Sequence, residues 1–124
     1  MLQGFEQYFP NKRIELIVSR TGGVTFKAGA IQSLGKCDFI QIFFKDDERL
    51  LAIQAAKESD NAVIPVRSKN SGVRCNSSDL VRKVLSLIDM DFSVYSSYKT
   101  EGVYLPKENA VVFDLKRATG SKKK

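Results

Sequence analysis

The chain of 124 residues contains the same predicted unit twice. Each copy predicts a strand, a glycine-containing turn, a second strand, a helix and a hairpin. The two copies span residues 12–56 and 62–116. Aligning Gly23 with Gly72 places Arg20 opposite Lys69 at equivalent turns. Neither copy alone has enough apolar residues for a core, so we expect the two to close on each other.

In the first copy, apolar residues alternate as in a strand, with Ile14, Leu16 and Val18 on one face. Residues 27–34 predict a short helix that ends at Gly35, a residue that favours the left-handed region after a helix. The strand over residues 38–44 follows. Its apolar residues occupy both faces, with Phe43 on the face opposite Ile42, which predicts that both faces are covered. Residues 45–49 predict a polar hairpin loop.

In the second copy, Pro65 places its strand at an edge or a bulge, because proline cannot donate a hydrogen bond to a neighbouring strand. Ser77 predicts the N-cap of a longer helix. The predicted core face of this helix consists of Leu80, Val84, Leu87 and Ile88. Residues 103–105 and 111–115 then predict a hairpin joined by the turn at residues 106–109.

The composition predicts one globular domain, which we assign to residues 1–118. Hydrophobic residues make up 43% of the chain, and no apolar stretch reaches the ~18 residues of a membrane span. The N-terminus does not show the basic start and apolar run of a signal peptide. Cys37 and Cys75 are too few for a disulfide framework, so a cytoplasmic protein with reduced thiols is expected, without a membrane partner.

The net charge of +6 is compatible with a nucleic-acid partner, although half of it comes from Lys122, Lys123 and Lys124. Residues 119–124 predict a disordered basic tail. Any binding surface on the body must therefore come from clustered basic side chains. The candidate nucleic-acid-binding residues lie at the equivalent turns of the two copies and on the strands beside them: Arg13, Arg20, Lys27, Arg67, Lys69 and Arg74.

No group of residues predicts catalysis, so we expect no enzyme, no cofactor and no metal site. Histidine, the usual general base near neutral pH, is absent from the sequence. The carboxylates at residues 46–48 are typical of a solvated hairpin tip. Asp89 and Asp91 leave a magnesium-dependent nuclease as a third interpretation. Tyr95, Tyr98 and Tyr104 lie near Lys99 and are either packed in a sheet or exposed for base stacking.

The segment from Ile17 to Gln54 resembles the AbrB class of swapped-hairpin DNA-binding proteins. The resemblance lies in the loop and strand of residues 20–26, the helix end Ala30-Ile-Gln-Ser-Leu-Gly35, and the charged hairpin of residues 39–53. Two copies in one chain are similar to the related MraZ-type proteins. The resemblance implies an α+β fold in which two tandem ββαββ-like repeats close into a small pseudo-twofold β-barrel of swapped hairpins with two helices. It also implies DNA binding through Arg13, Arg20 and Lys27.

Two main functions follow as hypotheses. The first is a small DNA-binding protein, either a transcriptional regulator or an accessory protein of a bacterial or phage mobile element. The second is a non-enzymatic protein-binding module or inhibitor, for example one encoded by a phage, on the same scaffold. The first predicts basic residues gathered on one face, and the second predicts an exposed apolar or tyrosine patch. Either a monomer or a homodimer is compatible with the sequence.

Overall fold

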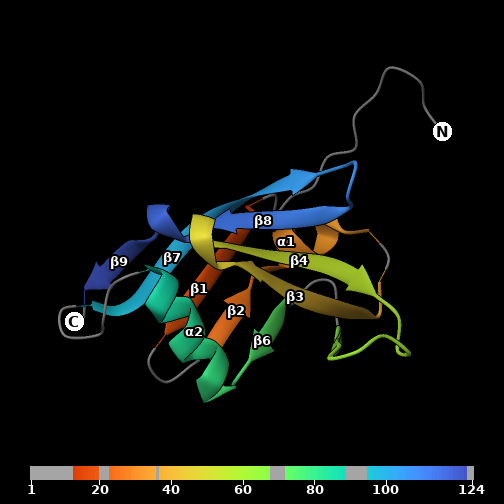
Figure 1. The fold of residues 1–124 in the computed structure, drawn as a ribbon, viewed down its shortest axis with the longest axis horizontal. Coiled ribbons are helices and arrows are strands. Elements are labelled where there is room, and N and C mark those ends of the chain that lie inside the picture. The colour runs from red at the N-terminus through yellow and green to blue at the C-terminus, as the bar shows by residue number, and fades with distance from the viewer. Residues whose placement is uncertain (1–12, 20–22, 36, 68–71, 89–94, 123–124) are drawn as a thin grey trace.

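The computed structural model describes residues 13–19, 23–35, 37–67, 72–88 and 95–122, which form an α+β fold (Figure 1). Its strands are β1 (Glu15–Ser19), β2 (Gly23–Phe26), β3 (Phe39–Lys45), β4 (Leu50–Ala56), β5 (Ile64–Pro65), β6 (Val73–Cys75), β7 (Tyr95–Leu105), β8 (Ala110–Asp114) and β9 (Thr119–Lys122). The helices of these residues are α1 (Ala28–Ser33) and α2 (Ser78–Ile88), together with the 3-10 turns η1 (Asp46–Glu48) and η2 (Leu115–Arg117).

Eight of these strands form a nearly closed antiparallel barrel in the order β5-β3-β4-β8-β7-β1-β2-β6. The two ends of this order, β5 and β6, are joined by the short connection of residues 66–72. The connection starts beside Asp38, whose carbonyl accepts the N–H of Val66. It ends at Gly72, which lies against the backbone of Phe26 and Lys27. The expected edge position of Pro65 is therefore confirmed.

The core lies inside the barrel, because alternate residues of each strand point inward. Leu16 and Val18 are fully buried on β1, which confirms the predicted strand phase. Phe26 of β2 and Phe113 of β8 lie with ring centroids 5.9 Å apart. Fully buried aliphatic residues from β3, β4 and β8 complete this layer: Ile40, Leu51, Ile53 and Val111.

The predicted end of α1 and the predicted start of α2 are both observed. Gly35 follows α1 with a φ of +79°, and the hydroxyl of Ser77 accepts a hydrogen bond from the N–H of Leu80 at the start of α2. α2 packs on β1 and β2 and also contacts η2 (Figure 1). It buries Val84, Leu87 and Ile88, as predicted. Leu80 is only half-buried, because it lies in the first turn, at the rim of the contact.

Two predictions are wrong, one about the C-terminal tail and one about the outer face of β3. Residues 119–122 form β9 against β7, although a disordered tail was predicted from residue 119 onward. Their polar sequence carries no apolar alternation, so no local pattern predicts the strand. Phe43 is 46% exposed, so the outer face of β3 is not covered at this residue.

None of the described helices is long and apolar enough to cross a membrane.

Candidate nucleic-acid interface

The outer surface of four neighbouring strands, β7, β1, β2 and β6, carries several of the basic residues. The strand registers align Lys99 with Ile17, Ile17 with Thr25, and Thr25 with Arg74, in one row across the strands. Lys99 and Arg74 are exposed at the two ends of this row. Three strand spacings place the backbones of these two residues ~14 Å apart.

Lys27 lies two residues beyond Thr25 and so points to the same outer surface. Its exposed side chain follows β2, and its backbone N–H donates to the carbonyl of Glu15, 2.9 Å away. Residues diagonally opposite on paired antiparallel strands lie ~7–8 Å apart. Lys27 is therefore a diagonal neighbour of Arg74. We call the surface formed by Lys27, Arg74 and Lys99 the basic face.

Glu15 modifies the charge of the basic face. Its side chain is 7% exposed, and its Oε2 lies 3.5 Å from the Nζ of Lys99. Among the described residues, this Oε2 is a buried atom without a hydrogen bond. The ion pair offsets part of the charge of Lys99, since Glu15 is shielded from water. Lys99 therefore offers less net positive charge to an anion than its exposed side chain alone would.

The structure brings together only some of the six predicted residues. Arg13 is exposed directly before β1, next to Ile14, whose carbonyl accepts the N–H of Gly102 at 2.8 Å. Arg67 is exposed after β5, the other end strand of the barrel, and no described strand pairing aligns it with Arg74. The structure therefore places Arg67 on another strand edge. Arg20 and Lys69 lie outside the described residues.

Lys99 belongs to the basic face, although it was not among the predicted binding residues. It enters through the pairing of β7 with β1, a contact between residues some 80 positions apart in the sequence. No local pattern signals such a pairing. Lys99 could have been identified from the alternation of β1 together with a correct choice of its partner strand.

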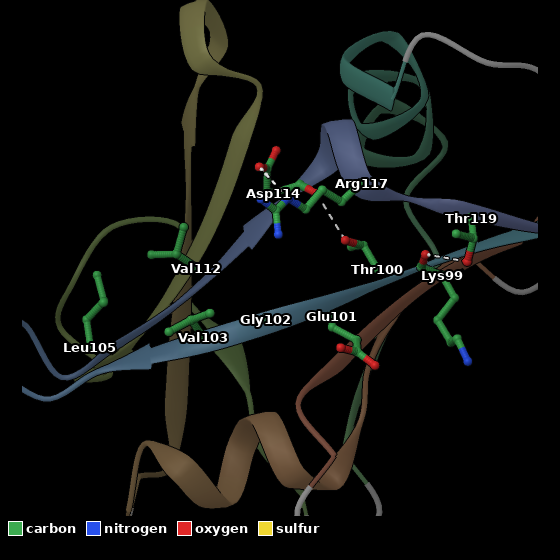
Figure 2. A pocket seen from close by; sticks show the side chains of 10 residues that line it. All are labelled: Lys99, Thr100, Glu101, Gly102, Val103, Leu105, Val112, Asp114, Arg117 and Thr119. Atoms are coloured by element: carbon green, nitrogen blue, oxygen red, sulfur yellow. Dashed lines mark hydrogen bonds and ion pairs between the residues drawn. The ribbon is translucent and has the colours of Figure 1, made fainter.

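A surface groove of about 740 Å³ runs along β7 beside the basic face (Figure 2). Apolar side chains line one end, and charged groups surround the other: Val103, Leu105 and Val112 against Lys99, Glu101, Asp114 and Arg117. The hydroxyl of Thr100 donates to the carbonyl of Asp114 at 3.0 Å. This hydrogen bond joins β7 to β8 where the lining of the groove changes from apolar to charged.

Asp114 is held as an anion within this groove. Its partial burial opposes ionisation, but hydrogen bonds from Lys116 and the charges of Lys116 and Arg117 outweigh this effect and lower the pKa of Asp114. The carboxylate lies 3.1 Å from the Nζ of Lys116. Lys116 is thereby paired within the chain and is a weaker phosphate-binding candidate than Lys27.

The tyrosines do not form an exposed stacking surface in the described part of the chain. Tyr98 is 1% exposed and faces the interior of the barrel. Tyr104 donates its hydroxyl to the Oδ1 of Asn109 at 2.7 Å. The side chain of Tyr95 lies outside the described residues. Packing in the sheet, the first of the two interpretations of these tyrosines, therefore holds for Tyr98.

The other candidate groups, in the charged hairpin and at the two cysteines, are paired or buried within the fold. Asp46 pairs with Lys83 of α2, and Glu48 pairs with Lys45, whose hydrogen bond lowers the pKa of Glu48. Cys37 and Cys75 are both buried and form no disulfide, and burial raises the pKa of the Cys75 thiol.

Within the described ranges, no group of three or more Cys, Asp or Glu side chains could hold a metal ion. Asp89 and Asp91, on which the nuclease interpretation depends, lie outside those ranges.

No protein-family model matches this chain, and neither a curated protein nor a solved structure is significantly similar to it.

Proposed function

We propose that this protein binds nucleic acid through the basic face, as a small DNA-binding regulator or mobile-element accessory protein. The observation that carries the proposal is the register of β2 with β6. It makes Lys27 and Arg74, which come from the two halves of the chain, diagonal neighbours on one exposed surface. Arg13 extends this surface beyond β1. Lysine and arginine side chains bind phosphate oxygens through charge-assisted hydrogen bonds.

The spacing of the basic face suits a duplex. The row from Lys99 to Arg74 spans ~14 Å, comparable to the ~12 Å width of the major groove of B-DNA. Cations at its two ends would therefore contact phosphates on both sides of a groove. Contacts of this kind give affinity without sequence readout. The proposal thus concerns phosphate-directed binding, and Arg20 and Lys69 stay predictions.

We also propose that the barrel is built from two tandem repeats of the swapped-hairpin type, residues 12–56 and 62–116. The strand pairings support this. Exchanging β1 with β5, β2 with β6, β3 with β7 and β4 with β8 converts the β1–β7 pair into β5–β3. The same exchange converts β3–β4 into β7–β8 and leaves β2–β6 and β4–β8 unchanged. Among the described pairings of these eight strands, only β1–β2 has no observed counterpart.

The two turn glycines give further support to the repeat. Gly23 and Gly72 both have a φ of +75°. A Cβ atom on Gly23 would lie 2.2 Å from the carbonyl oxygen of Cys75, and one on Gly72 would lie 2.3 Å from that of Phe26. Each glycine thus approaches the end of the opposite copy's strand in the same way, and in both places a side chain would collide with backbone.

The test of the nucleic-acid proposal is a fluorescence anisotropy titration with random-sequence duplex and single-stranded DNA. We expect binding at low salt that weakens steeply towards physiological salt, because phosphate contacts release counterions. Lys123 and Lys124 should be replaced by serine throughout, since a polybasic end binds DNA weakly by itself. A variant that binds neither form of DNA at low salt would exclude the proposal.

A protein-binding module is the second candidate function. It is favoured by Val103 and Phe43, which are 63% and 46% exposed on the outside of the barrel. If the basic face fails to bind DNA, an apolar surface of this kind becomes the functional surface. The test compares partner binding by two variants. Val103→Arg should abolish binding to a partner protein while Lys27→Ala leaves it unchanged, and the opposite pattern would exclude this second function.

A further inference from the structure

Glu15 is an acidic side chain buried within the basic face. Leu16 points into the barrel, so the alternation of β1 places its neighbour Glu15 on the outer side of the strand. The Glu15 side chain is nevertheless only 7% exposed. Glutamate is almost never buried to this degree unless a cation or hydrogen bonds compensate its charge. A carboxylate at this place lowers the charge of a surface that is otherwise rich in cations.

Three basic residues are neighbours of this carboxylate. Arg13 lies two residues earlier in the chain, and Lys27 lies opposite Glu15 beyond the end of β2, with a backbone hydrogen bond of 2.9 Å between them. Lys99 is a diagonal neighbour on β7, because the register pairs it with Ile17. Among the described residues, only Lys99 forms an ion pair with Glu15. The carboxylate therefore acts most directly on this one cation.

The ion pair between Glu15 and Lys99 is close but not tightly bonded. The Nζ of Lys99 lies 3.5 Å from the Oε2 of Glu15. Charge-assisted hydrogen bonds are shorter, ~2.7–2.9 Å, and this Oε2 accepts no hydrogen bond within the described part of the chain. The Lys99 side chain is 48% exposed, so an anion from solution can reach its ammonium group. Lys99 can therefore exchange Glu15 for another anion.

A phosphate group must compete with Glu15 for this ammonium group. If Lys99 moved entirely to a phosphate, a carboxylate shielded from water would lose its cation, which is strongly unfavourable. If Lys99 stayed with Glu15, the carboxylate would repel the phosphate beside it. In both cases the contribution of Lys99 to phosphate binding is reduced.

We infer that Glu15 is an internal competitor of phosphate for Lys99, and that it holds the affinity of the basic face for nucleic acid below the level that its cations allow. The inference rests on the proposed function, since it concerns the regulation of the same surface. One end of the row from Lys99 to Arg74 binds phosphate only at the expense of the ion pair. Removing the carboxylate should make the whole row available.

Glu15→Gln tests the inference in the anisotropy titration with duplex DNA, with Lys123 and Lys124 again replaced by serine. Glutamine keeps the size of the side chain and removes its charge. Binding should tighten several-fold at low salt, and the log–log salt slope should steepen by ~0.9, as for one added phosphate contact. Glu58→Gln, in the exposed turn after β4, removes the same charge elsewhere and should leave affinity and slope close to those of the wild type.

Two double variants test whether the effect passes through Lys99. E15Q/K99Q should lose the gain in affinity and slope, because the released cation is itself absent. E15Q/K107Q has the same net charge, with the lysine removed from the exposed turn after β7, and should keep the gain. Equal binding by the two double variants would overturn the inference. Glu15→Leu, an apolar side chain in place of the buried charge, should reproduce E15Q, so the result does not depend on how glutamine packs.

The binding data also separate this inference from the proposed function. If the wild type binds DNA and E15Q binds with the same affinity and slope, Glu15 does not compete with phosphate, and only the inference fails. If neither the wild type nor E15Q binds at low salt, the basic face is not a nucleic-acid interface, and both fail. Binding by E15Q alone would support the inference, because the carboxylate would then block the face.

Discussion

The guanidinium group of Arg49 caps the C-terminal end of α2 at Ile88. Its Nη2 donates to the carbonyl of Ile88 at 2.8 Å, and its Nε donates to the carbonyl of Leu87 at 2.6 Å. The last carbonyls of a helix have no partner within it and carry partial negative charge. The β3–β4 hairpin tip thus fixes the helix that closes the core, and the charged loop has a structural purpose.

Arg49→Lys should therefore destabilise the fold, although it keeps the charge. A lysine has no planar fork and can reach only one carbonyl well. We expect a loss of ~1.5–3 kcal/mol in the free energy of unfolding, the usual range for a hydrogen bond to a charged group. Urea denaturation measures it. Arg82→Lys, on the exposed side of α2, is the control and should change stability little. Equal stabilities of the two variants would contradict the cap.

Leu87→Ala should cost ~2–5 kcal/mol, because it removes a buried side chain from the contact of α2 with the barrel. The neighbouring Arg82→Ala is the control for loss of a long side chain on the exposed side of the same helix. Thermal and urea unfolding of both variants check the result. A loss below about 1 kcal/mol for L87A would mean that the burial of this helix side is misassigned.

Gly102→Ala should destabilise the β7–β8 pair by overpacking. An added Cβ would lie 2.6 Å from a ring carbon of Phe113 and 2.9 Å from a methyl group of Ile14. Overpacked sites typically lose ~1–3 kcal/mol. Ser97→Ala, earlier on β7, is the control. In the background of Phe113→Leu, the cost of G102A should shrink, and an unchanged cost would show that the ring does not restrict this position.

The Cys75 thiol gives a prediction about pH. Burial raises its pKa above the ordinary value of 9.0, so the folded state holds the thiol proton more tightly than the unfolded state. The resulting stability is complete below pH ~9 and is lost as the pH rises towards the folded pKa. The stability difference between wild type and Cys75→Ala should therefore shrink from pH 7 to pH 10. A constant difference across this range would contradict the raised pKa.

The local features of this fold could be predicted because each has a local cause. The alternation of Leu16 and Val18, the cap at Ser77 and the left-handed Gly35 depend on near neighbours in the chain. They gave correct elements and correct buried sides. The exposure of Phe43 was missed, because a strand with apolar residues on both sides gives no sign of what covers the second side.

The candidate sites depend on registers between distant strands, and the sequence could only suggest part of them. Arg74 and Lys27, two of the predicted binding residues, are exposed. Lys99 joins them only because β7 pairs with β1, and the polar β9 likewise pairs with β7. The role of Arg49 likewise depends on a contact with α2, 39 residues further along the chain.

Nucleic-acid binding by the basic face should depend on Lys27 and Arg74. The most direct measurement is the salt dependence of duplex DNA binding by K27A/R74A, compared with the charge-matched control K57A/K107A, whose lysines are exposed elsewhere. Each lost phosphate contact removes ~0.9 from the log–log slope. We predict weaker binding and a slope flattened by about two for K27A/R74A, with little change in the control. Equal slopes and affinities for the two double variants would contradict the claim.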